Sequence, residues 1–299
     1  MSTWTAHALN VRQTGTGPAT VVLAHGFGND QCVWTPYIEH LAGHFRVITY
    51  DLACAGSADK AFFDMCRHRD LEGYVTDLLT ILDDLSVDRC NFVGHSVSGM
   101  IGLMAARRRP GLIEKLIMVG SSACYLNLDD YLGGWDRDTV NQLLITIASD
   151  YHAWINAFAP FVVSRPPENP VAMDFAASLR TIRPDIALAT AEMILLGDYR
   201  DQLAAIEVPA VILQTRNDPA VPLSAAQFMH DHLKGSMLEI LDTTGHMPNM
   251  TSVEIVEDAL WRHLGVAPWQ AKIAVAQDAR SGYRLAATSR DRLIGNDAR

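Results

Sequence analysis

Residues 91–99 read Asn-Phe-Val-Gly-His-Ser-Val-Ser-Gly, and this segment restricts the fold of the chain more than any other. A short apolar run leads into a turn of small residues, and an apolar helical pattern follows over 100–105. A strand, a very tight turn and a helix in this order expose a serine side chain as a nucleophile, provided that its neighbours are small. In the usual form, Gly-x-Ser-x-Gly, glycine fills both small positions. Here Gly94 fills the first and Ser98 the second, which leaves Ser96 as the candidate nucleophile.

Two later loops supply the partners that a serine nucleophile needs. A serine hydroxyl becomes reactive when a base accepts its proton and a third group orients the base. Asp218 follows the β-branched run 210–214, and His246 lies on a loop after the apolar run 237–241. Active-site residues of open α/β sheets gather at such strand ends, and the chain order Ser, Asp, His is typical of this arrangement. Asp218 could be a turn residue and His246 an isolated loop histidine, but their joint order favours a triad with Ser96.

An early glycine-rich loop predicts the remaining part of the site. His25-Gly26-Phe27-Gly28 directly follows a short apolar run at 21–24. Acyl transfer requires backbone N–H groups directed at the oxygen that becomes negative in the tetrahedral intermediate. One donor is expected from Val97, the residue after the nucleophile, and the other from this loop. Phe27 is the expected second donor, since the flanking glycines let the backbone approach closely. The alternative is that the segment is only a tight turn.

Apolar runs alternate with helical patterns over most of the chain. Strands are expected at 5–12, 20–25, 45–50, 90–93, 116–120, 210–214 and 237–241, and a helix at 71–85. This alternation indicates an α/β fold with a mostly parallel sheet and helices on both faces.

The region between the two halves of the sheet has a different pattern. No strand is evident there, and helical stretches are expected at 137–147, 152–162, 171–182 and 186–196. We therefore expect an inserted all-helical cap at 122–198 over a core formed by 1–121 and 199–265. A tail of unknown role follows at 266–299.

The inner lining of the cap is expected to set substrate specificity. An apolar, aromatic pocket around the nucleophile is the usual form of a small-molecule site. Its candidates are His25 of the early loop and the side chains Tyr125, Trp154, Phe158, Phe161, Met193 and Ile194. For each of them, ordinary packing between helices is the alternative.

Composition limits the remaining classes of function. The chain has 299 residues, of which 49% are hydrophobic and 19% charged, as in a globular enzyme with a large core. The formal net charge of −10 argues against a nucleic-acid or anionic-membrane partner, and no apolar run approaches the roughly 18 residues of a membrane span. Five cysteines show neither metal-type spacing nor a disulfide framework, and the N-terminus has no signal-peptide pattern. A cytoplasmic protein without metal or cofactor is expected.

Several longer strings extend the pattern beyond the triad. They are His25-Gly26-Phe27-Gly28 with Trp34, Cys54-Ala55-Gly56-Ser57, Gly94-His95-Ser96-Val97-Ser98, Cys124-Tyr125-Leu126-Asn127 with Asp130-Tyr131 and Gly133-Gly134, and Arg183-Pro184-Asp185-Ile186-Ala187. Over roughly residues 5–264 the chain resembles the α/β hydrolases of the RsbQ, DWARF14 and karrikin-receptor group. Ser98 is typical of that group, whereas the tail after the last core helix departs from it.

The resemblance implies both a fold and an activity. The fold is that of an α/β hydrolase, with Ser96, Asp218 and His246 as the triad and with Phe27 and Val97 as oxyanion donors. Such proteins are slow hydrolases that also act as small-molecule sensors. Plant members perceive butenolides, strigolactones or karrikin-like compounds, and bacterial members act upstream of a partner phosphatase. The resemblance therefore also implies a signalling protein partner.

We interpret the chain as a cofactor-free serine hydrolase of the esterase or lactonase type. Its expected ligand is a small, largely apolar ester, lactone or butenolide, which would acylate Ser96. Two alternatives stay open. The chain could be a signalling receptor or phosphatase activator whose hydrolysis is incidental, or a carbon–carbon bond hydrolase that uses the same triad.

Overall fold

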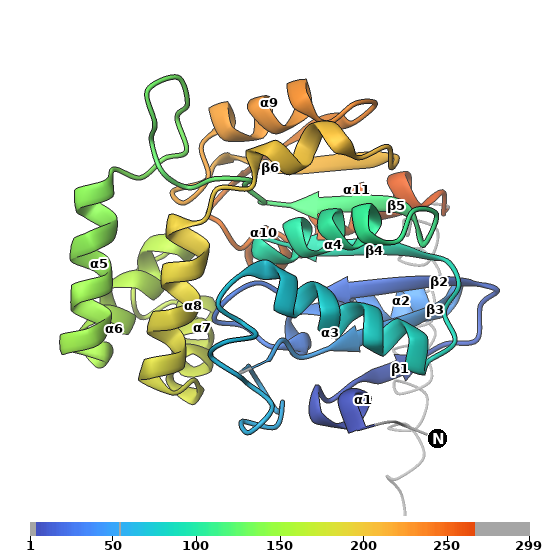
Figure 1. Ribbon diagram of the computed structural model, residues 1–299, viewed down its shortest axis with the longest axis horizontal. Helices are drawn as coiled ribbons and strands as arrows, with labels where there is room; N and C mark the ends of the chain where they lie inside the picture. The colour runs from blue at the N-terminus through green and yellow to red at the C-terminus, as the bar shows by residue number, and fades with distance from the viewer. Residues whose placement is uncertain (1–3, 54, 267–299) are drawn as a thin grey trace, which may run out of the picture. The chain divides into compact units, whose positions relative to one another are not determined.

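The computed structural model describes residues 4–53 and 55–266, and a seven-stranded sheet forms its centre (Figure 1). Its helices and strands are α1 (Trp4–Ala8), β1 (Arg12–Thr14), β2 (Ala19–Ala24), α2 (Thr35–Ala42), β3 (Phe45–Tyr50), α3 (Leu71–Asp84), β4 (Cys90–His95), α4 (Val97–Arg108), β5 (Ile113–Val119), α5 (Arg137–Ser149), α6 (Tyr151–Val163), α7 (Pro170–Thr181), α8 (Pro184–Leu196), β6 (Ala210–Asn217), α9 (Leu223–His232), β7 (Met237–Thr244), α10 (Pro248–Thr251) and α11 (Val253–Leu264). The strand order is β1-β3-β2-β4-β5-β6-β7. Only β1 is antiparallel to its neighbour, which confirms the mostly parallel sheet that the sequence predicts.

Both faces of the sheet are buried. Side chains alternate between the two faces along each strand. Val22, Ile48 and Phe92 belong to one apolar cluster together with side chains of α3 and α4. Their neighbours Val21 and Val47 are also fully or almost fully buried, and point to the opposite face, which α2 covers (Figure 1). Strands that are buried on both faces are almost continuously apolar, which is why most of them could be recognised from the sequence.

The strand expected at 5–12 is wrong. This segment begins with the short helix α1, and β1 starts only at Arg12. Asn10 separates the two elements because its backbone has a φ of 49°, in the left-handed region. The Asn10 side chain also donates a hydrogen bond to the buried Asp51 carboxylate at 2.8 Å. The alternation of apolar and polar residues in this stretch therefore reflects a helical turn followed by a tight bend, and the strand is shorter than expected.

Helices α5 to α8 follow β5 in the chain and lie beyond the carboxyl ends of the parallel strands (Figure 1). The four helices expected between 137 and 196 are all present. Asn169 caps the start of α7 by accepting a hydrogen bond from the Val171 N–H, and proline opens both α7 and α8. The four helices share an apolar cluster that also includes Met247, from the loop after β7. This cluster joins the inserted helices to the end of the sheet.

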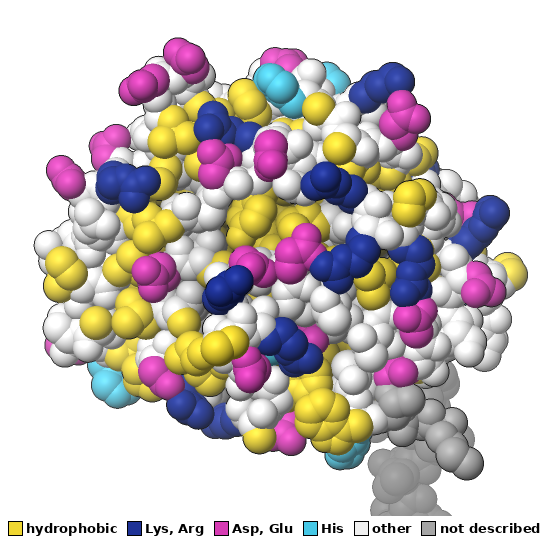
Figure 2. Space-filling model, in the orientation of Figure 1, with side chains coloured by type: hydrophobic (Ala, Val, Ile, Leu, Met, Phe, Trp, Pro, Cys, Tyr) yellow, Lys and Arg dark blue, Asp and Glu magenta, His cyan; other side chains and the backbone are white. Residues whose placement is uncertain are grey.

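The chain divides into two compact units, 1–257 and 258–299. The first contains every strand described above, and the second is described only as far as residue 266. The tail expected from 266 onward therefore lies almost wholly outside the described residues. In the described part of the chain, no helix is long and apolar enough to cross a membrane. On the face drawn in Figure 2, basic side chains are interspersed with acidic ones.

Candidate active site

Ser96 lies in a strained turn between β4 and α4. Its φ of 55° and ψ of −124° are values that residues other than glycine rarely adopt. The turn is so tight that a Cβ atom at Gly94 would lie 2.5 Å from the backbone of Ser98 and Gly99. The Ser121 hydroxyl donates a hydrogen bond to the Ser96 carbonyl at 2.8 Å and so stabilises the turn. The small residues of the motif are thus required by contact with neighbouring backbone.

The structure brings together the three residues of the predicted triad. The Ser96 Oγ atom lies 2.9 Å from His246 Nε2, and His246 Nδ1 lies 2.9 Å from Asp218 Oδ2. With Nδ1–H donating to the carboxylate, Nε2 is left to accept the serine proton. The residues follow β4, β6 and β7, whose carboxyl ends meet at one edge of the sheet. All three side chains are buried, since Ser96 is 7% exposed and His246 5% exposed, while the Asp218 side chain is 0% exposed.

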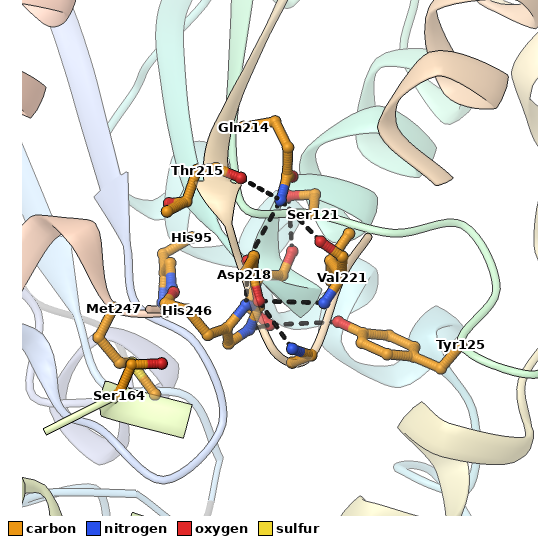
Figure 3. Close-up of polar contacts among 12 residues, drawn as sticks. His95, Ser121, Tyr125, Ser164, Gln214, Thr215, Asp218, Val221, His246 and Met247 are labelled. Atoms are coloured by element: carbon orange, nitrogen blue, oxygen red, sulfur yellow. Dashed lines mark hydrogen bonds and ion pairs between the residues drawn. The ribbon is translucent and has the colours of Figure 1, made fainter. Parts of the chain in front are cut away.

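Four donors surround the Asp218 carboxylate (Figure 3). Its Oδ1 atom accepts hydrogen bonds from the Ala220 N–H at 2.8 Å and the Val221 N–H at 3.0 Å. Its Oδ2 atom accepts from His246 and from Gln214 Nε2, the latter at 3.3 Å. Burial alone would raise the pKa of Asp218, but the charge of His246 and these hydrogen bonds together hold it below its ordinary value. The group is therefore an ionised carboxylate at neutral pH. Gln214 was not predicted from the sequence, where it is one more residue of an apolar strand.

Two further buried histidines, His95 and His25, bond to the backbone of loops that surround the site. His95 Nε2–H donates to the His246 carbonyl at 2.8 Å, and burial together with repulsion from His246 lowers the pKa of His95 to about 3. His25 Nδ1–H donates to the Gly26 carbonyl at 2.8 Å, while its Nε2 accepts from the Leu52 N–H at 3.0 Å. Burial also lowers the pKa of His25. Both rings are neutral, and each holds a loop of the site in place.

The glycine-rich loop lies directly against Ser96, the predicted nucleophile. A Cβ atom at Gly26 would be 3.0 Å from the Ser96 Cβ atom. The Ser98 hydroxyl donates to the His25 carbonyl, so the residue that replaces the second glycine of the motif ties the nucleophile turn to this loop. Val97 is the first residue of α4, where backbone N–H groups have no partner within the helix and the helix dipole is positive. The roles of Phe27 and Val97 as oxyanion donors stay predictions.

An apolar cavity opens onto Ser96 and His246. Of the predicted pocket residues, Tyr125, Trp154, Phe158 and Ile194 line it. Residues that were not predicted as its lining are Phe27, His95, Trp135, Leu143, Val162, Phe175, Ala191, Leu195, Ala220 and Met247.

Three predicted pocket residues lie elsewhere. His25 and Met193 line a second, smaller cavity, and Phe27 contacts both cavities. On α8, Ala191 and Ile194 face the main cavity, whereas Met193 is about 200° away from Ala191 around the helix axis. Phe161 is 47% exposed and packs edge-on against Trp135, with ring centroids 5.8 Å apart. The prediction therefore identified the right helices but not always the inward side.

Tyr125 contacts Ser96, the predicted nucleophile, and also lines the cavity. Its hydroxyl lies 3.3 Å from Ser96 Oγ. Burial raises the pKa of Tyr125, so the phenol is neutral and able to donate a hydrogen bond. The sequence predicted this residue only as part of the pocket, because nothing in its local pattern indicates a partner.

The site thus combines candidates for a nucleophile, a base and an orienting carboxylate with an apolar cavity. These are the groups that acyl transfer through a covalent intermediate requires. In the described residues no group of three or more His, Cys, Asp or Glu side chains is placed to hold a metal ion.

Known proteins share this architecture. A family model described as the alpha/beta hydrolase fold matches residues 19–253. The karrikin insensitive 2 receptor CA of Petunia hybrida is 41% identical over 86% of this chain and 96% of its own length. The strigolactone esterase D14 of Arabidopsis thaliana is 41% identical over 82% of this chain and 92% of its own length. Among solved structures, a hydrolase from Oleispira antarctica matches with a TM-score of 0.83 and 32% identity, covering 87% of this chain and 95% of that one.

Proposed function

This chain belongs to the α/β-hydrolase family, within the group of karrikin receptors and strigolactone esterases, and we propose that it hydrolyses small apolar esters or lactones. One observation carries the proposal. The hydrogen bonds from Ser96 through His246 to Asp218 are in place, and they end at an apolar cavity. The relatives at 41% identity include a protein named as an esterase, which agrees with this chemistry.

The mechanism follows from the geometry. Ser96 Oγ attacks the substrate carbonyl while its proton passes to His246 Nε2, 2.9 Å away. Asp218 keeps the imidazole in the tautomer that can accept this proton, and its negative charge stabilises the imidazolium. The carbonyl oxygen becomes negative next to the N–H groups of Phe27 and Val97, which we propose as its donors. His246 then protonates the leaving oxygen and an acyl-enzyme remains. Water, deprotonated by the same imidazole, releases the acid and restores Ser96.

The lining of the cavity defines the substrate class. Most of the side chains that face Ser96 are aliphatic or aromatic, and Trp154 stacks on Phe158 with ring centroids 4.9 Å apart. A charged acyl group would lose its hydration there without gaining an ionic partner. A compact apolar ester or a lactone such as a butenolide fits these walls. We propose that residues 122–198 act as the cap that closes over this ligand, above a core of 1–121 and 199–265.

A sensor role is favoured by one further contact. The backbone N–H of His246 donates to the carbonyl of Val162, in the last turn of α6, at 2.7 Å. The cap is thus bonded directly to the backbone of the proposed catalytic base. A ligand that displaces α6 would therefore change the position of the cap and that of His246 together. Relatives of this chain include proteins named as receptors. In this second proposal the chain is a cytoplasmic, ligand-triggered protein that signals to a protein partner.

Steady-state hydrolysis tests the proposed function. The wild type, Ser96→Ala and Ser149→Ala are compared on p-nitrophenyl acetate and on a synthetic butenolide. Ser149 is a matched control, because its exposed hydroxyl donates to the Ile145 carbonyl of its own helix and to no other group of the described residues. We expect the wild type and Ser149→Ala to release product at equal rates and Ser96→Ala to release none. Equal activity of Ser96→Ala and wild type would refute the assignment of the nucleophile.

A further inference from the structure

Trp135 connects the ligand cavity with the turn that carries Asp218. It lies just before α5, is 8% exposed, and its side chain lines the cavity together with Ser96 and His246. Its indole Nε1–H donates a hydrogen bond to the Ala220 carbonyl at 3.0 Å. The only side-chain donor of this residue is therefore used on the turn that follows the catalytic carboxylate.

The turn from Asp218 to Val221 depends on a small number of bonds. Ala220 and Val221 each donate their N–H to Asp218 Oδ1. Gln214 Nε2 donates to the Val221 carbonyl at 2.9 Å and so connects the turn to the sheet. Trp135 holds the adjacent Ala220 carbonyl from the side of the cavity. Ala220 thus offers its N–H to the carboxylate and its carbonyl to the indole, so a shift of this residue changes both bonds.

The loop that bears Trp135 also follows the turn beyond Ala220. A Cβ atom at Gly134 would lie 2.8 Å from the Pro222 ring, and Ser224 Oγ donates to the Leu132 carbonyl at 3.1 Å. Loop and turn are therefore in close contact over several residues, and the indole bond is one part of a continuous interface.

The same loop also contacts the nucleophile. The backbone N–H of Trp135 donates to the backbone carbonyl of Tyr125 at 3.0 Å, and the Tyr125 hydroxyl lies 3.3 Å from Ser96 Oγ. Two cavity-lining aromatic residues that are bonded to each other through their backbones thus contact the nucleophile and the turn of the acid. A ligand that enters the cavity meets both of these side chains.

We propose that Trp135 is a positioning residue, whose indole N–H fixes the Asp218 turn and through which a bound ligand acts on the alignment of Asp218 with His246. This inference rests on the proposed function. The Trp135 ring is part of the cavity wall. A ligand that displaces the ring therefore breaks its hydrogen bond to the Ala220 carbonyl, and a ligand that packs against the ring keeps this bond and the Asp218 carboxylate in place. Trp135 acts through Asp218 and takes no part in bond breaking.

The test removes the indole N–H and keeps an aromatic ring. Trp135→Phe does this, and Trp34→Phe is the matched control, because Trp34 is fully buried and its Nε1 has no hydrogen-bond partner among the described residues. Loss of one neutral hydrogen bond corresponds to about a 2- to 10-fold change in a rate or equilibrium constant. We expect kcat on p-nitrophenyl acetate to fall by about this factor in Trp135→Phe, with KM unchanged, and no change in Trp34→Phe.

A spectroscopic measurement separates positioning from packing. The His246 Nδ1 proton, bonded to a carboxylate, gives a downfield NMR resonance that reports the alignment of Asp218 without any substrate. We expect this resonance to move upfield or broaden in Trp135→Phe and to stay in place in Trp34→Phe. Replacing Trp135 by benzothienylalanine, which keeps the indole shape and lacks only the N–H, is expected to reproduce the effect of Trp135→Phe.

Two results would overturn the proposal. One is an unchanged resonance and kcat in the benzothienylalanine variant; the other is a change of KM alone in Trp135→Phe, since either would show that the ring only fills space. Failure of the proposed function would look different. In that case Ser96→Ala would keep its activity, while the Nδ1 resonance would still report whether Trp135 holds the turn.

Discussion

Adding one methyl group at Gly26 is expected to damage the site more than the fold. A Cβ atom there would lie 2.7 Å from His95 Nδ1 and 3.0 Å from the Ser96 Cβ atom. Neither neighbour can move freely. The His95 ring is fully buried and bonded through Nε2 to the His246 carbonyl, and Ser96 is held in its strained turn.

The size of the effect follows from these distances. Nonbonded heavy atoms are most stable at about 3.5–4.0 Å, so the His95 ring must shift by roughly 1 Å. Overpacking of this kind costs about 1–3 kcal/mol of folding free energy. Because the ring is bonded to His246, the shift reaches the proposed base, and a misplacement of about 1 Å lowers turnover on the order of 100-fold.

Urea unfolding and hydrolysis of p-nitrophenyl acetate measure the two effects in Gly26→Ala. Gly43→Ala is the control, because a Cβ atom there meets only the His40 carbonyl at 3.4 Å. The double variant Gly26→Ala/His95→Ala tests the cause, since removing the ring removes the clash and makes the two costs non-additive. Fully additive costs, or a Gly26→Ala enzyme as active as the wild type, would refute the reasoning.

Three further predictions concern the hydrogen bonds of the site. Asp218→Asn is expected to lower kcat by on the order of 10³- to 10⁴-fold, because an amide facing His246 favours the wrong imidazole tautomer; ester hydrolysis measures this, and a loss under tenfold would contradict it. Ser98→Ala removes the hydroxyl that holds the His25 carbonyl and is expected to cost about 1–2 kcal/mol in urea unfolding; an unchanged midpoint would show that this bond contributes nothing. Burial lowers the pKa of His25 and lowers that of His95 to about 3, so as the pH falls from the unfolded value of 6.5 toward 3 the unfolded chain binds protons that the folded chain does not. The free energy of unfolding therefore falls as the pH falls through this window, by up to about 1.4 kcal/mol per pH unit for each histidine, and urea titrations that give a flat profile there would contradict this.

The three residues of the predicted triad stand out in the sequence for a physical reason. Strands buried on both faces leave continuous apolar runs, and the residue after each run must lie at the carboxyl edge of the sheet. Ser96, Asp218 and His246 each follow such a run, and the structure places them within hydrogen-bond distance. The fold of the sheet was predictable from the same signal.

Other parts of the site depend on contacts that no local pattern records. Trp135 lies in a loop without periodicity, and its hydrogen bond to Ala220 joins residues 85 positions apart. Gln214 resembles any other buried strand residue until its amide is seen beside Asp218. On α8 the helical period separates the inward Ala191 and Ile194 from Met193, but only once one inward residue is known. Short-range patterns predict elements, whereas a cavity lining requires their three-dimensional arrangement.

A nucleophilic Ser96 carries the acyl group during turnover, and intact-protein mass spectrometry after acid quenching detects that group. Wild type and Ser96→Ala are mixed with p-nitrophenyl acetate, quenched during turnover, and digested to locate any added group. We expect one acetyl group on the peptide that contains Ser96 in the wild type, and none on the corresponding peptide of Ser96→Ala. Turnover without an acylated Ser96 peptide, together with an equal rate in Ser96→Ala, would contradict it.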